Sequence, residues 1–167
     1  MSFLVATFFY TGCLRPAPGT WGSLAAVVTG LGLVSLGGWL ALAIGVVLAF
    51  GLGMWATHHQ TQGSDDHDPS EIVIDEVAGQ WIALGPVAIG AAHAGVSIFA
   101  LWPGIICAFV LFRLFDIWKP GPVGWADRQQ GPLGVMLDDV IAGGLAALGV
   151  LALAWLAHSG ILSTITE

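Results

Sequence analysis

Long runs of apolar residues dominate the chain and decide what it can fold into. A helix that crosses the roughly 30 Å of bilayer hydrocarbon needs about 20 mostly apolar residues. Only 9% of the residues are charged and the mean hydropathy is +0.86, whereas a soluble domain has about 25% charged residues. We therefore expect an integral membrane protein. Its apolar runs occupy residues 24–36, 39–57, 77–92, 98–115 and 140–157.

These runs predict an all-α fold, a polytopic membrane helical bundle of about five hydrophobic segments. Several runs are shorter than a full crossing requires. The first and third are therefore expected either to span half the bilayer or to extend into the polar residues before them. The 167 residues suit one compact unit, since about 150 residues is usual for a single domain. We expect residues 1–167 to form one membrane domain, and the sequence predicts no particular oligomeric state.

The polar stretches are expected on one face of this bundle. If each segment crosses once, residues 11–23, 58–76 and 113–139 emerge together, and all Lys and Arg residues lie within them. Cytoplasmic loops of membrane proteins carry an excess of Lys and Arg. The shared face is therefore predicted to be cytoplasmic.

Charged residues are few and clustered, and in a membrane they are costly and tend to mark function. Ten of the eleven acidic residues lie between Asp65 and Asp139. The chain offers no broad basic surface for the phosphates of a nucleic acid, so we expect no nucleic-acid partner. The basic residues are Arg15, Arg113, Lys119 and Arg128.

Two of the predicted helices each carry a pair of acids followed by small residues. The segments read VIDEVAG, with Asp75 and Glu76, and LDDVIAG, with Asp138 and Asp139. If the two helices face one another, four carboxylates meet near one membrane interface and repel. Mg²⁺ relieves that repulsion, because it takes oxygen ligands and keeps waters for an incoming phosphate. The alternative is that each pair only complements its helix dipole, but two such pairs in so charge-poor a chain favour the metal.

The helix that carries the first pair is predicted to start early. Asp68 can cap it, Pro69 suits its first position, and Glu71 completes a capping box. Asp75 then shares a face with Glu71 and lies about two turns in. Gly79 leaves room for another helix or a substrate group to approach.

Between the two acidic pairs lies a segment, residues 112–134, that holds most of the basic residues. Arg113 and Asp116 are spaced to pair on one helix end, and the sequence KPGP from Lys119 onward ends that helix. Cations held beside a metal can clamp a phosphate, because phosphoryl transfer depends on positioning and charge stabilisation. Interfacial anchoring by Trp118, Trp125 and Lys119 is a simpler role that can coexist.

Together these motifs resemble the phosphatidylglycerophosphatase A family, bacterial membrane phosphatases that convert phosphatidylglycerophosphate to phosphatidylglycerol. The resemblance covers nearly the whole chain. It rests on PGTWGSLAA (residues 18–26), DPSEIVIDEVAGQWIAL (68–84), FRLFDIWKP (112–120), WADR (125–128) and GVMLDDVIAG (134–143).

The resemblance implies a Mg²⁺-dependent phosphomonoester hydrolase of phospholipid synthesis. We expect a multi-pass protein of the bacterial inner membrane whose active site faces the cytoplasm. Its phospholipid substrate is expected to come from the bilayer. The family's acidic and basic positions fall on Asp75, Glu76, Asp116, Asp127, Asp138, Asp139, Arg113, Lys119 and Arg128.

Other phosphatase chemistries fit the chain poorly. Cys107 and Arg113 match C-x5-R, but CAFVLFR is an apolar helix without a glycine for a phosphate-binding loop. Asp66 and Asp68 echo D-x-D, but no apolar strand precedes them. The histidines form no lipid-phosphatase signature. By elimination we expect attack by a metal-activated water, with an aspartyl-phosphate intermediate as the alternative.

Individual roles follow as hypotheses. One group of acids would hold the metal, namely Asp75, Glu76, Asp138 and Asp139. Asp116 or Asp127 would orient the water or a basic partner. The phosphate would be neutralised by Arg113, Lys119 and Arg128. In RPAPGTWGS, exposed helix-start amides with Arg15, Thr20 and Ser23 would receive the second phosphate or glycerol hydroxyls, or the segment is only a turn before a helix that Thr20 or Ser23 caps.

Two functions from other classes compete with this interpretation. An ion or proton translocator also uses intramembrane carboxylates, but it needs acids at mid-membrane depth and polar residues on both sides. A structural assembly protein would use the small residues of the helices for close packing. Neither explains two diacid helices beside a segment rich in Lys and Arg.

Overall fold

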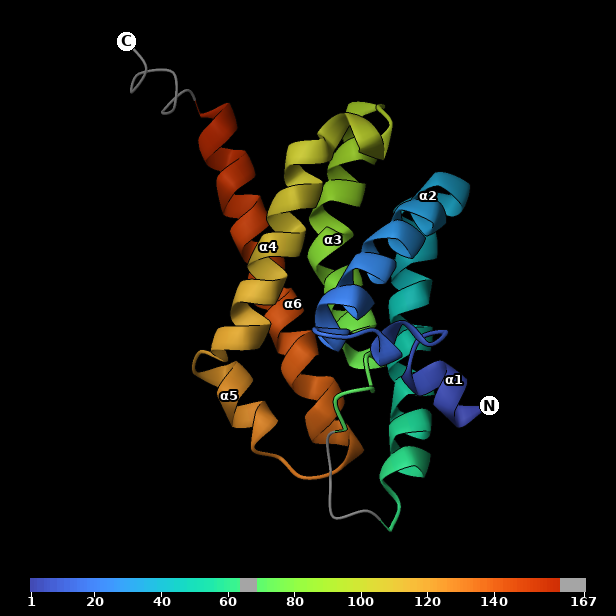
Figure 1. Cartoon of the computed structure of the whole chain (residues 1–167). Helices are drawn as coiled ribbons and strands as arrows, with labels where there is room; N and C mark the ends of the chain where they lie inside the picture. The colour runs from blue at the N-terminus through green and yellow to red at the C-terminus, as the bar shows by residue number, and fades with distance from the viewer. Residues whose placement is uncertain (64–68, 160–167) are drawn as a thin grey trace.

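The computed structural model describes residues 1–63 and 69–159, and all regular secondary structure in this part of the chain is helical (Figure 1). Two short 3₁₀ turns, Thr11–Cys13 and Ile98–Leu101, accompany the α-helices. The α-helices are α1 (Ser2–Ala6), α2 (Pro18–Thr61), α3 (Ile74–Ala94), α4 (Trp102–Trp118), α5 (Pro122–Asp127) and α6 (Pro132–His158).

Four helical stretches of the described residues are long and apolar enough to cross a membrane: Pro18–Thr61, Ile74–Ala94, Ile98–Trp118 and Pro132–His158. Five separate spanning segments are not confirmed: four stretches in the described part of the chain qualify, and the first two predicted segments form the two halves of α2. That element is broken at Gly37 and Gly38, where Gly38 has a φ of +65° that favours glycine. Figure 1 shows the two halves of α2 folded back beside one another.

Helix α3 lies at the centre of the bundle. In its most apolar window 56% of the residues are buried, against 22% or less in the other spanning helices. It packs against both α2 and α6. Because neighbouring helices shield α3 from lipid, this helix can carry buried polar side chains such as Asp75 and Gln80.

Small residues let α3 and α6 cross closely. A Cβ atom at Gly143 would overlap the carbonyl oxygen of Gly79, and one at Gly79 would lie 2.5 Å from the carbonyl oxygen of Asp139. Gly79 follows Glu76 by one turn of α3, and Gly143 follows Asp139 by one turn of α6. The crossing therefore brings the acid-bearing turns of the two helices together.

Helix α3 begins later than the sequence predicted. It starts at Ile74, with Val73 before it and no side-chain cap. The backbone N–H of Val73 donates to the carbonyl oxygen of Ala6 in α1 (2.9 Å), and Glu71 pairs with Arg15 instead of completing a capping box. The expected cap, Asp68, lies outside the described residues.

Two consequences of that predicted start are therefore wrong. Glu71 and Asp75 do not share a helix face, and Asp75 and Glu76 occupy the first turn of α3 instead of lying two turns in. The start of α2 also differs, because Ala17 precedes Pro18 at its first position. Thr20 and Ser23 lie inside the helix and do not cap it.

Candidate active site

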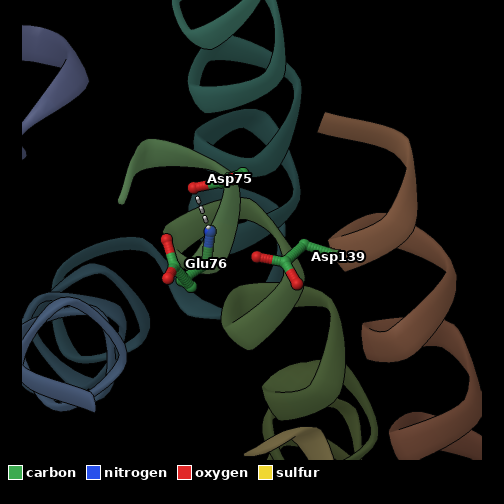
Figure 2. A group of neighbouring side chains, drawn as sticks. All are labelled: Asp75, Glu76 and Asp139. Atoms are coloured by element: carbon green, nitrogen blue, oxygen red, sulfur yellow. Dashed lines mark hydrogen bonds between the residues drawn. The ribbon is translucent and has the colours of Figure 1, made fainter. Parts of the chain in front are cut away.

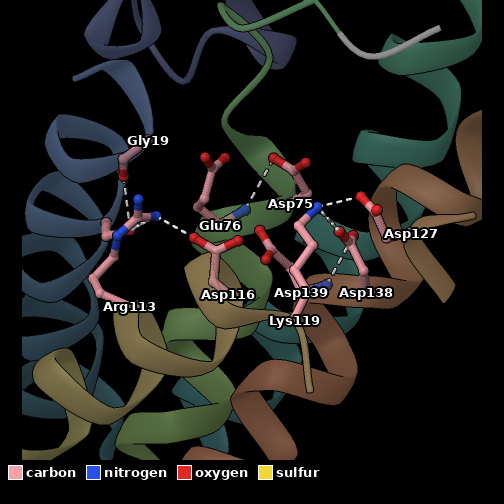
Figure 3. A network of polar contacts seen from close by, with 10 residues as sticks. Gly19, Asp75, Glu76, Arg113, Asp116, Lys119, Asp127, Asp138 and Asp139 are labelled. Carbon is pink, nitrogen blue, oxygen red and sulfur yellow. Dashed lines mark hydrogen bonds and ion pairs between the residues drawn. The ribbon is translucent and has the colours of Figure 1, made fainter. Parts of the chain in front are cut away.

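A cavity of about 340 Å³ opens at the end of the bundle where α3 and α6 begin. It holds most of the acidic and basic residues singled out from the sequence (Figure 3), and its walls come from four separate parts of the chain. We call it the acidic pocket. Its walls are Ala17, Pro18, Gly19, Thr20, Ser70, Ile72, Asp75, Glu76, Arg113, Asp116, Ile117, Lys119, Asp138 and Asp139.

Three carboxylates converge in this pocket, those of Asp75, Glu76 and Asp139 (Figure 2). One oxygen of each lies within 4.8 Å of the others. Asp75 Oδ1 accepts a hydrogen bond from the backbone N–H of Glu76 (3.0 Å). This bond holds the Asp75 side chain at the start of α3. We call these residues the acid trio.

The acid trio contains buried atoms that need a partner. Neither Glu76 Oε2 nor Asp139 Oδ1 has a hydrogen-bond partner within residues 1–63 and 69–159. A buried carboxylate oxygen without a partner is costly. Hard divalent cations such as Mg²⁺ bind carboxylate oxygens grouped in this way. The donor set of the acid trio therefore fits a Mg²⁺ ion.

Arg113 approaches the acid trio from α4. Its Nη1 atom lies 2.5 Å from Asp116 Oδ2, so the pair predicted from the i, i+3 spacing forms. The same nitrogen donates to Ser23 Oγ (3.3 Å), and Ser23 in turn donates to the carbonyl oxygen of Gly19 (2.8 Å). Arg113 is thereby fixed between α4 and the first turns of α2, and Asp116 lies beside Asp139 (Figure 3).

Gly19 is a site residue that sequence reasoning missed. A Cβ atom here would collide with Glu76 Oε1 and lie 3.1 Å from Arg113 Nη1. Only a residue without a side chain lets α2 come so close to both groups. Its place in PGTWGS, directly after the proline that starts α2, was the available signal.

Lys119 joins three helices at the other side of the pocket. It ends α4 in the left-handed conformation, with a φ of +49°. Its Nζ atom pairs with Asp127 of α5 and with Asp138 Oδ2 of α6 at 2.9 Å. Partial burial alone lowers the pKa of Lys119, but hydrogen bonds and charges from Asp127 and Asp138 outweigh it and raise the pKa above its ordinary value.

The two members of the second acidic pair therefore face different partners. Asp139 belongs to the acid trio, whereas Asp138 binds Lys119 and also accepts the backbone N–H of Asp139 (3.0 Å) at Oδ1. Both side chains are buried. The second pair thus divides its carboxylates between the cluster of acids and the lysine.

The remaining sequence candidates lie around the pocket. Ser23 is buried and accepts a hydrogen bond from Arg113 Nη1. Arg15 donates to Glu71 Oε1 (2.7 Å) and to Ser70 Oγ (3.4 Å), and Ser70 lines the pocket. Asp127 and Arg128 line a neighbouring cavity of about 210 Å³ that shares Asp138 with the acidic pocket.

A family model and two relatives name the same family. A family model described as phosphatidylglycerophosphatase A matches residues 4–154. A phosphatidylglycerophosphatase A of Haemophilus influenzae is 40% identical over 151 residues, covering 90% of this chain and 86% of the relative. One of Escherichia coli is 34% identical over 145 residues, covering 86% of this chain and 78% of the relative.

A third relative bears a different name. A putative phosphatidylinositol-3-phosphatase of Bacteroides thetaiotaomicron is 38% identical over 145 residues, covering 84% of this chain and 85% of the relative. No solved structure matches the chain.

Proposed function

Because the chain belongs to the phosphatidylglycerophosphatase A family of phosphomonoester hydrolases, we propose that it removes the terminal phosphate of phosphatidylglycerophosphate in a Mg²⁺-dependent reaction. The products are phosphatidylglycerol and inorganic phosphate. One observation carries the metal-dependent part of the proposal: the acid trio and Arg113 line the same pocket. That combination offers ligands for a cation and a donor for a phosphate.

Asp75, Glu76 and Asp139 would hold the cation. When bound, Mg²⁺ lowers the pKa of a water and polarises a phosphoryl oxygen. Asp138 takes a supporting role in this proposal, because Lys119 already engages its Oδ2 atom. Its contacts with Lys119 and with the backbone of Asp139 fix the turn of α6 from which Asp139 reaches the trio.

Arg113 would bind the oxygens of the terminal phosphate. A guanidinium presents several N–H donors in a rigid fork that matches phosphate geometry. Asp116 and Ser23 hold the Arg113 guanidinium in place before substrate arrives. A donor positioned in advance stabilises developing charge without a cost of reorganisation during the reaction.

Asp116 is the better of the two candidates for orienting the attacking water. It lines the acidic pocket, whereas Asp127 lies outside the pocket lining and pairs with Lys119. Its carboxylate would accept the proton of the water as the water oxygen bonds to phosphorus and the bond from phosphorus to the glycerol oxygen breaks. The same proton would then pass to the leaving glycerol oxygen, which gives phosphatidylglycerol and inorganic phosphate. Lys119 adds positive charge at the pocket wall, while Arg128 lies in the neighbouring cavity and would act only at longer range.

The substrate would be taken from the bilayer of the bacterial inner membrane, with the pocket at its cytoplasmic face. Thr20 lines the pocket, and Arg15 donates a hydrogen bond to Ser70, which also lines it. Thr20 and Arg15 are therefore candidates to bind the second phosphate and the glycerol hydroxyls of the headgroup. Ser23 does not take this role, because it accepts a hydrogen bond from Arg113. The ion translocator is not favoured, since the relatives are named as phosphatases.

Phosphate release from purified protein in mixed micelles tests the proposal. We expect wild type to release phosphate from phosphatidylglycerophosphate with Mg²⁺ and to lose this activity in EDTA. Glu76→Gln and Asp139→Asn should each lower kcat by on the order of a hundredfold or more, as expected when charge-stabilising groups are removed. Phosphatidylinositol 3-phosphate belongs in the same assay, because one relative carries that specificity in its name.

Glu71→Gln is the matched control for Glu76→Gln. Glu71 has a carboxylate that lies outside the pocket lining and pairs with Arg15, so the variant should keep its Mg²⁺ dependence. Thermal unfolding of each variant separates loss of the site from loss of the fold. Wild-type activity that persists in EDTA would contradict the role of the metal, and absence of activity on both lipids would contradict the function.

A further inference from the structure

The acidic pocket accommodates only part of a phospholipid. Its volume of about 340 Å³ is at the low end of the range of about 300–1,000 Å³ that is usual for small-molecule sites. A phosphorylated headgroup fits such a volume, but two long acyl chains do not. If the pocket hydrolyses a lipid phosphate, as proposed above, the chains must lie on the helix surfaces that border it.

One apolar row leads away from the pocket along α4. Ile117 lines the pocket and is 71% exposed. Residues at intervals of three and four share one face of a helix, so Arg113, Val110 and Ile106 follow Ile117 along α4. Val110 and Ile106 are 53% and 52% exposed. We call Ile106, Val110 and Ile117 the α4 row.

A second apolar row leads away from the pocket along the first half of α2. Thr20 lines the pocket, and the same helical spacing places Leu24, Val27 and Leu31 on its face. Leu24 is 40% exposed, and Val27 and Leu31 are half-buried against the core. We call Leu24, Val27 and Leu31 the α2 row.

Both rows start at the place where the phosphate would bind. Arg113 of α4 donates to Ser23 of α2, so the two helices meet at the level of the guanidinium. Figure 1 shows the first half of α2 and the helix α4 on either side of α3. A phosphate held by Arg113 therefore leaves the rest of the lipid next to Thr20 and Ile117, where the rows begin.

We propose that the acyl chains of the phosphomonoester lipid lie against the α2 row and the α4 row while its headgroup occupies the acidic pocket. Lipid tails are as apolar as leucine, so these contacts add little hydrophobic driving force within a bilayer. The contacts with the two rows instead determine how the lipid is oriented relative to the pocket. The lipid reaches the pocket sideways from the bilayer, and its chains remain in hydrocarbon.

A second apolar cavity is the competing location for the chains. It measures about 290 Å³ and lies between the second half of α2 and α3, where Trp39, Val46 and Ile82 are among its lining residues. None of the residues that line this cavity also lines the acidic pocket. A chain in that cavity would not be continuous with a headgroup beside Arg113.

Bulky substitutions distinguish the two locations. Leu24→Trp and Val110→Trp obstruct the rows, and Val46→Trp fills the competing cavity. For each variant kcat/KM is measured on the diacyl lipid in vesicles and on the same headgroup after deacylation, in water. We expect both row variants to lose on the order of tenfold in kcat/KM on the diacyl lipid, with little change on the deacylated headgroup, and Val46→Trp to behave as wild type.

A photoreactive acyl chain on the phosphomonoester lipid gives a second measurement that does not depend on turnover. Crosslinks should map to residues 20–31 and 106–117 and should be displaced by unlabelled substrate. Equal losses on both substrates, a selective loss in Val46→Trp, or crosslinks to the rows that substrate does not displace would each overturn the proposal. A wild type that hydrolyses neither substrate while those crosslinks are still displaced would contradict the proposed function and leave the acyl location standing.

Discussion

Lys119 Nζ lies 2.9 Å from Asp138 Oδ2 and thereby ties the end of α4 to the first turns of α6. The same nitrogen pairs with Asp127 of α5 (Figure 3). A lysine bound by two carboxylates is less available to a phosphate than its sequence position suggested. It engages the carboxylate of Asp138, whose neighbour Asp139 belongs to the acid trio.

Removing Lys119 should therefore disturb the site through Asp138. In Lys119→Met two carboxylates lose their cation, and we expect a loss of about 1–2 kcal/mol of stability, since hydrogen bonds to charged groups contribute about 1.5–3 kcal/mol and Lys119 is partly exposed. Thermal unfolding and kcat measure the effect. Combining Lys119→Met with Asp138→Asn should recover part of the stability, because the unpaired charge is gone. Strictly additive losses would contradict the coupling.

The raised pKa of Lys119 predicts how activity depends on pH. A raised pKa means that the stabilising charge is fully present below the unfolded-state pKa of about 10.4 and is lost only as pH rises through the higher folded-state value. From about pH 6 to about pH 10 the lysine stays protonated. The pH–rate profiles of wild type and Lys119→Arg should therefore have the same shape. An alkaline limb that disappears in Lys119→Arg would show that Lys119 titrates in this range.

The crossing of α3 and α6 predicts a contrast between two adjacent glycines. Gly143→Ala would press a methyl group against the carbonyl oxygen of Gly79, whereas a Cβ at Gly144 meets nothing within 4 Å. We expect Gly143→Ala to cost about 1–3 kcal/mol through overpacking. Gly144→Ala should be neutral or stabilising by up to about 1 kcal/mol, because alanine favours helix. Thermal unfolding of the two variants measures these changes in stability. Equal changes in Gly143→Ala and Gly144→Ala would contradict the close crossing of α3 and α6.

Local features of the site could be predicted from the sequence. The end of α4 at Trp118 follows from the KPGP sequence, and the pair of Arg113 and Asp116 follows from helical spacing. Both depend on residues within a turn or two of each other. The all-helical class follows from the apolar runs.

Features set by distant contacts could not be predicted in this way. The start of α3 depends on a hydrogen bond between Val73 and Ala6, two residues far apart in the chain. The division between Asp138 and Asp139 depends on how α6 is rotated against α3. That rotation is fixed by packing between residues far apart in the chain, which the spacing within either helix does not encode.

Gly19 provides the sharpest test of how α2 contributes to the site. In Gly19→Ala the new methyl group would meet Glu76 Oε1 and Arg113, both far ends of flexible side chains. The helix can therefore form, but Glu76 and Arg113 must move by several tenths of an ångström. Misplacement on this scale costs catalysis strongly, because groups that act on a phosphate must be held in position. We expect kcat to fall by about tenfold or more with little change in thermal unfolding.

Gly32→Ala is the matched control, because Gly32 lies in the same helix and a Cβ atom there meets nothing within 4 Å. It should keep both activity and stability. If Gly19→Ala kept wild-type kcat, the first turn of α2 would not constrain Glu76 and Arg113 during turnover. If both variants lost activity together with stability, the effect would come from α2 as a whole instead of from its contact with the acid trio.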